Sequence, residues 1–157
     1  MRRFTILFMA LALAATTTLP AVAGSDRVFH ARLRGANEVP AVDSDGVGHA
    51  IVSIAQDEES IEYLLQVARL EGIVQAHIHL GTEGVNGPVV AFLFGPVPEG
   101  ADVSGKIASG TITADDLVGP LEGQPLSSLI EAIRSGDAYV NVHTLAHPMG
   151  EIRGQLG

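Results

Sequence analysis

The chain has 157 residues, no cysteine and a formal charge of −9 with histidine neutral, from 18 acidic and 9 basic residues. The absence of cysteine excludes a disulfide framework, thiolate metal ligands and iron–sulfur clusters. The few basic residues are scattered, which excludes a basic patch of sequence neighbours for binding nucleic acid or anionic lipid. The length suits a single domain with its own hydrophobic core.

The first residues have the pattern of a secretory signal peptide. Two arginines precede an apolar run over residues 4–15, and the small-x-small sequence at residues 21–23 follows, as is typical of cleaved export signals. We therefore expect a signal peptide over residues 1–23 and one β domain over residues 24–157. Loss of the two arginines would lower the formal charge from −9 to −11. We expect a secreted or periplasmic protein with no membrane span after signal removal, because no later apolar segment has the required length.

Short strands separated by turns dominate the rest of the chain. Apolar residues alternate with polar ones, and glycine, proline, asparagine and aspartate separate the runs. This pattern predicts strands over residues 27–33, 48–55, 61–67, 76–80, 89–94, 106–112, 138–143 and 151–156. The run 89–94 is apolar throughout, which predicts a strand buried on both faces.

One segment has helical periodicity. From Leu126 to Ile133, four apolar residues follow i, i+3, i+4, i+7 spacing, with Pro125 at the start and Gly136 at the end, so we expect a helix over residues 125–134. We predict an all-β fold, an antiparallel Greek-key sandwich or barrel of superoxide-dismutase-like or immunoglobulin-like type, with one short helix.

The predicted strand 76–80 carries two histidines. Because alternate residues of a strand point to the same face, His77 and His79 should lie side by side while the residues between them face the core. A second pair, His143 and His147, lies near the C-terminus. Imidazoles without thiolate suit copper(II) or zinc(II), and we favour copper.

Five motifs in order extend over about residues 27 to 156. They are Phe29-x-Ala31-x-Leu33-x-Gly35-x-Asn37-Glu38-Val39-Pro40, Ala76-His77-Ile78-His79-x-Gly81, Gly87-Pro88-Val89-Val90, Tyr139-Val140-Asn141-Val142-His143-Thr144 and Pro148-x-Gly150-Glu151-Ile152-Arg153-Gly154-Gln155-Leu156. In these motifs the chain resembles the CHRD domain, which is named after chordin and also occurs alone in exported bacterial proteins. The resemblance implies an extracytoplasmic all-β domain. Its motifs include His77, His79 and His143, whereas His147 falls at a position that varies in the family.

Four further residues are candidates for orienting the ligand imidazoles by hydrogen bonds. They are Asn37, Glu38, Glu151 and Arg153. The structural alternative is that Asn37 and Glu38 form a turn at the end of the sheet, while Glu151 and Arg153 join cross-strand ion pairs.

Three functions remain open from the sequence. The first is an exported protein that binds one transition-metal ion, copper rather than zinc, through His77, His79 and His143, with His147 as a fourth candidate. The second is a metal-free extracellular interaction module that contacts another exported protein. The third is a small metalloenzyme with redox chemistry like that of copper–zinc superoxide dismutases, which share paired histidines on a Greek-key fold. The absence of a Gly-x-Ser-x-Gly nucleophile motif argues against a hydrolase, and we favour binding over catalysis.

Overall fold

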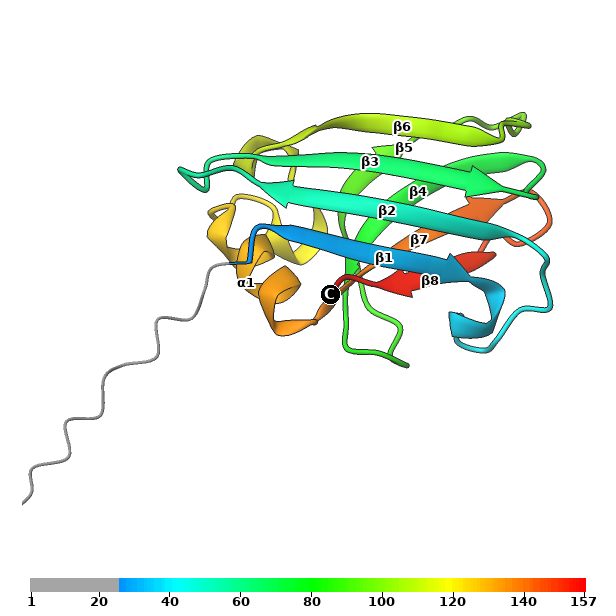
Figure 1. Cartoon of the computed structure of the whole chain (residues 1–157), viewed down its shortest axis with the longest axis horizontal. Coiled ribbons are helices and arrows are strands. Elements are labelled where there is room, and N and C mark those ends of the chain that lie inside the picture. The colour runs from blue at the N-terminus through cyan, green and yellow to red at the C-terminus, as the bar shows by residue number, and fades with distance from the viewer. Residues whose placement is uncertain (1–25) are drawn as a thin grey trace, which may run out of the picture.

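The computed structural model describes residues 26–157, and a single antiparallel sheet of eight strands is its main structural feature (Figure 1). Its strands are β1 (Val28–Arg34), β2 (Val47–Ile54), β3 (Ile61–Ala68), β4 (Ile73–Leu80), β5 (Val89–Phe94), β6 (Gly105–Ile112), β7 (Ala138–Thr144) and β8 (Ile152–Gln155). They are hydrogen-bonded in the order β5-β4-β7-β8-β1-β2-β3-β6. The predicted signal peptide lies outside the described residues.

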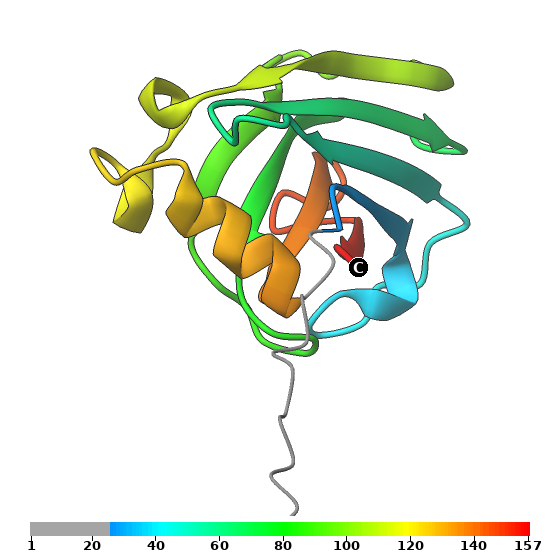
Figure 2. The same ribbon diagram turned by 60° about the vertical axis from the view of Figure 1, so that its left-hand side comes forward.

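The sheet curves until its two edge strands come near each other. Figure 2 shows β5 and β6 approaching to form a nearly closed barrel. This curvature follows from the right-handed twist between neighbouring strands, which accumulates across eight strands. The prediction of an all-β antiparallel fold is confirmed.

The predicted helix is also confirmed. Helix α1 (Ser127–Ser135) buries Leu129, Ile130 and Ile133 beside β7, and Gly136 ends it with a left-handed φ of 75°. Three short 3-10 turns complete the structure: η1 (Gly35–Asn37), η2 (Ala114–Asp116) and η3 (Gly119–Leu121). In Figure 1, α1 lies at the left-hand end of the barrel.

Alternate residues of most strands fill the barrel interior. Ala76 and Ile78 of β4 and Val140 and Val142 of β7 have no solvent exposure, and burying each larger apolar side chain contributes roughly 1.5–3 kcal/mol. One detail of the sequence interpretation is wrong: Phe92, in the run 89–94, is 47 % exposed. Phe92 packs edge-on against His77, with ring centroids 4.6 Å apart, and the rest of its ring faces solvent on the outer side of β5.

The outer face of β4, β7 and β8 carries buried polar side chains. These side chains, which we call the outer polar layer, are His77, His79, Tyr139, Asn141, His143 and Arg153. Their contacts with residues 38, 85–87 and 148–150 show that loops shield this wall from solvent. The barrel therefore has an apolar interior and a separate polar layer between its wall and its loops.

Candidate metal centre

Strand register brings three histidines together. His77 and His79 of β4 lie opposite Asn141 and Tyr139 of β7, and His143 follows on the same face of β7. The three imidazoles are 3 %, 8 % and 6 % exposed in that order. One nitrogen from each ring lies within 4.8 Å of the others, so the three histidines are close enough to hold a metal ion.

Backbone carbonyls set the tautomers of two of these rings. His79 donates its Nδ1–H to the carbonyl of Gly87 at 2.9 Å, and His143 donates its Nδ1–H to the carbonyl of Pro148 at 3.0 Å. The Nε2 atoms of both rings are therefore unprotonated lone-pair donors in the neutral state. Metal-binding histidines in proteins are commonly oriented in this way.

The third ring completes the cluster. His77 Nδ1 lies 3.2 Å from His143 Nε2. His77 Nε2 and His79 Nε2 are buried and have no hydrogen-bond partner. Such unsatisfied buried atoms are uncommon in proteins, and a water molecule, a ligand or an ion is among the groups that can satisfy them.

The cluster disfavours protonation. Burial, reinforced by the neighbouring His143 and His79, lowers the pKa of His77 to about 3. Burial also lowers the pKa of His79 and of His143, against the opposing effect of their carbonyl hydrogen bonds. Neutral imidazole is the form that binds metal ions.

Tyr139 stacks against the face of the His79 ring. The two rings stack with centroids 4.9 Å apart and planes 12° apart. The Tyr139 hydroxyl accepts the N–H of Gly87 at 3.1 Å, and the carbonyl of Gly87 is the acceptor for His79. Residue 87 therefore links the phenol to the imidazole.

Arg153 anchors the loop above this stack. Its guanidinium carbon lies 3.4 Å from the centroid of Tyr139. It donates hydrogen bonds to Asn86 Oδ1 at 3.0 Å and to the carbonyl of Val85 at 2.7 Å. Asn37 in turn donates to the carbonyl of Arg153 at 2.9 Å. Arg153 and Asn37 hold loops in place, and neither has a hydrogen bond to an imidazole in residues 26–157.

Glu38 forms a buried pair with Asn141. It is 7 % exposed, and its Oε2 accepts the Asn141 Nδ2–H at 3.5 Å. Glu38 Oε1 and Asn141 Oδ1 are buried without partners. Burial raises the pKa of Glu38 to about 7, although the charge of Arg153 and the Asn141 hydrogen bond act in the opposite direction.

Among the described residues, the remaining candidates, Glu151 and His147, form no hydrogen bond with the three rings. Glu151 accepts hydrogen bonds from Ser44 at 2.7 Å and Thr144 at 2.6 Å, and no described residue forms an ion pair with it or with Arg153. His147 is half-buried and is not a member of the three-histidine group. Its backbone N–H donates to Thr144 at 3.1 Å.

The sequence interpretation missed Tyr139 and Asn141 as members of the site. Their spacing with His143 at i, i+2 and i+4 was visible, and it places all three on one strand face. The carbonyls of Gly87 and Pro148 had no sequence signal, because every residue has a carbonyl.

Among residues 26–157, no helix is long and apolar enough to cross a membrane. Comparisons with curated proteins and with solved structures found no significant match. A comparison with protein-family models matched the CHRD domain over residues 29–156. This match extends over nearly all described residues, and the chain belongs to the CHRD domain family.

Proposed function

We propose that the protein binds one transition-metal ion through His77, His79 and His143. The observation that carries the proposal is the unpartnered, buried Nε2 of His77 and of His79 within a group of three neutral imidazoles. Leaving a buried acceptor unsatisfied costs about 1–3 kcal/mol. A bound cation would recover this energy, so the donor set fits a metal.

Ligand chemistry favours copper over zinc. The group contains nitrogen donors only, with no carboxylate or thiolate. For such donors the affinity of divalent ions rises to a maximum at copper and falls at zinc. Once bound, copper would supply Lewis acidity and one-electron redox chemistry.

Binding or sequestration of the ion outside the cytoplasm is the role that we infer. Membership of the CHRD family and the export signal expected at the N-terminus both support an extracytoplasmic location. We do not infer catalysis by the bound metal, because three protein ligands alone do not define a reaction.

One observation favours a metal-free interaction module instead. The 3.2 Å separation of His77 Nδ1 and His143 Nε2 is itself a hydrogen-bond distance. In that case His77 donates to His143, which donates to Pro148, and the chain of bonds joins β4 to the loop after β7. The histidines would then stabilise loops that contact another exported protein.

Copper and zinc titrations of the exported, untagged protein distinguish the metal-binding function from the metal-free interaction module. We expect one copper(II) per chain, bound more tightly than about micromolar Kd, or about 8 kcal/mol. The variants His77→Ala, His79→Ala and His143→Ala should each weaken binding at least about 100-fold, or about 2.7 kcal/mol. His147→Ala and His30→Ala are the matched controls and should leave the affinity unchanged.

The fold of each variant is measured without metal by urea unfolding. Lost copper binding in a folded His79→Ala protein supports the metal site. Weak binding in the parent protein, together with unfolding of His79→Ala in the absence of metal, would support the structural alternative.

A further inference from the structure

Two adjoining pockets are lined by loops at the end of the barrel opposite α1; these loops lie on the right in Figure 1. The larger has a volume of about 770 Å³ and the smaller about 310 Å³. Ala146 lines both pockets. Loops between β1 and β2, β3 and β4, β5 and β6, and β7 and β8 therefore build one continuous surface.

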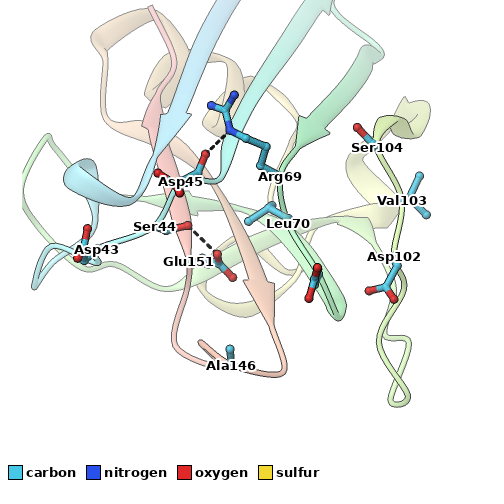
Figure 3. Close-up of a pocket in the computed structure, with 11 residues that line it drawn as sticks. Asp43, Ser44, Asp45, Arg69, Leu70, Asp102, Val103, Ser104, Ala146 and Glu151 are labelled. Carbon is cyan, nitrogen blue, oxygen red and sulfur yellow. Dashed lines mark hydrogen bonds between the residues drawn. The ribbon is translucent and has the colours of Figure 1, made fainter.

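The larger pocket is acidic. Its lining contains a single cationic side chain, Arg69, whose Nε–H donates to the backbone carbonyl of Asp45 at 2.7 Å. Figure 3 shows Arg69 at the top of the view, with the side chains of Asp43, Glu151 and Asp102 below it. The five carboxylates are Asp43, Asp45, Glu71, Asp102 and Glu151.

Only two of these carboxylates accept hydrogen bonds from other residues in the described part of the chain. Asp102 accepts the N–H of Gly72 at 2.7 Å, and Glu151 accepts the hydroxyls of Ser44 and Thr144. Within the described part of the chain, the carboxylates of Asp43, Asp45 and Glu71 have no hydrogen bond or ion pair. The pocket therefore presents negative charge that its own residues leave largely unneutralised.

The smaller pocket is mostly apolar. Val39, Pro40, Val42, Pro148 and Met149 contribute to its walls. Glu38 also lines it, but this residue is 7 % exposed and its Oε1 is buried beside Asn141 and Gly150 in the outer polar layer. The aliphatic stem of a lysine or arginine matches the apolar walls, and its charged end matches the carboxylates of the adjoining pocket.

Large apolar side chains are concentrated around these pockets. Among residues 26–157, seven large hydrophobic side chains are exposed, and four of them belong to this end of the barrel: Val39, Val103, Leu145 and Met149. Met149 is 88 % and Leu145 58 % exposed. Clustered exposed apolar groups beside charged ones are typical of protein interaction sites.

We propose that this end of the barrel is a docking surface for a segment of another exported protein that carries lysine or arginine next to large apolar side chains. A free cation alone would leave Leu145 and Met149 exposed, whereas an apolar segment alone would leave the acidic pocket unneutralised. Charge complementarity steers such association and makes it sensitive to salt. This inference is independent of metal binding at the three histidines.

Fluorescence anisotropy with labelled peptides tests the proposal on the full-length exported protein. The probe is a peptide of about twelve residues with alternating lysine and leucine pairs, which combines the cationic and apolar groups of the proposed segment. Two control peptides replace every lysine by glutamate or every leucine by serine. We expect the lysine–leucine peptide to bind at least about 10-fold more tightly than either control, and more weakly as salt rises from about 0.05 M to 0.3 M.

Matched variants locate the binding surface. Asp43→Asn/Asp45→Asn/Glu71→Gln and Leu145→Ser/Met149→Ser should each weaken binding at least about 10-fold. The controls remove three charges and two exposed apolar side chains elsewhere: Glu59→Gln/Glu62→Gln/Asp115→Asn and Val28→Ser/Val85→Ser. These controls should bind like the parent protein.

Three results would overturn the proposal. The first is equal binding of the glutamate peptide, and the second is equal loss in surface and control variants. The third is self-association of the parent protein that Leu145→Ser/Met149→Ser abolishes, seen by sedimentation, which would assign the surface to a second copy. Should a variant fail to fold, the comparison of the three peptides and the salt dependence on the parent protein still decides the outcome.

Discussion

His77 Nδ1 and His143 Nε2 lie 3.2 Å apart although the two residues are separated by 66 positions in the chain. The pairing of β4 with β7 creates this contact. Both rings are buried, and burial lowers the pKa of both. A buried, neutral cluster responds to pH differently from histidines on a surface.

Copper affinity should therefore change little in mild acid. We expect less than about a 10-fold loss between pH 7 and pH 5.5, because protons compete weakly for rings whose pKa is lowered. Three histidines with an ordinary pKa near 6.5 would lose roughly 1000-fold over this range. Titrations in non-coordinating buffers at several pH values measure the slope. A steep loss below pH 6.5 would contradict the prediction.

Glu38 should make the fold less stable as pH rises. Its pKa is raised to about 7 in the fold from 4.5, so the folded state holds the proton more tightly than the unfolded state. The resulting stability is fully present below pH 4.5 and is lost as pH rises through 7, by up to about 3 kcal/mol. The free energy of unfolding of Glu38→Gln, relative to the parent protein, should increase by this amount from pH 4.5 to 8.

Metal-free urea unfolding at several pH values measures that difference. Glu59→Gln is the matched control, because Glu59 is an exposed carboxylate in the turn between β2 and β3. A parallel pH dependence in Glu38→Gln and Glu59→Gln would show that burial of Glu38 has no effect.

Tyr139→Phe should weaken copper binding without loss of the ring stack. The change removes the acceptor for the Gly87 N–H at 3.1 Å and loosens the carbonyl that orients His79. We expect a loss of about 10-fold in affinity, as is common for residues that orient metal ligands. Tyr63→Phe is the control, since its hydroxyl donates to the carbonyl of Leu93 at 2.9 Å and forms no hydrogen bond with the residues that orient the histidines. Equal losses of affinity in both variants would argue against a positioning role for Tyr139.

Gly150→Ala should destabilise the polar layer. Its φ is +124°, and a Cβ at this position would lie 2.6 Å from Asn141 Oδ1 and 2.8 Å from Glu38 Oε1. We expect a cost of about 2–4 kcal/mol from strain and steric overlap. Gly123→Ala, at φ +73° with no atom within 4 Å of the added Cβ, should cost only about 1 kcal/mol. Urea unfolding of both variants measures these costs, and similar values would show that the layer can relax around Gly150.

Local patterns in the sequence were sufficient to predict most elements of the fold. Alternation over residues 138–143 and helical spacing over residues 125–134 correspond to β7 and α1. The same alternation placed His77 and His79 on one face of β4, as the structure confirms. These features depend on the two-residue period of a strand and the 3.6-residue period of a helix, which are properties of neighbouring residues.

Only the tertiary structure decided what surrounds those histidines. The sequence identified His143 as a partner through a family resemblance, but the order of strands places it beside His77, and that order depends on packing of the whole core. The stack of Tyr139 on His79 and the burial of Glu38 arise from the same long-range pairing. The carbonyls of Gly87 and Pro148 set the imidazole tautomers through loop conformation, and backbone groups are common to all residues. The sequence alone was thus sufficient to identify the candidate histidines. The distances between them, their burial and their protonation are determined by the barrel and its loops.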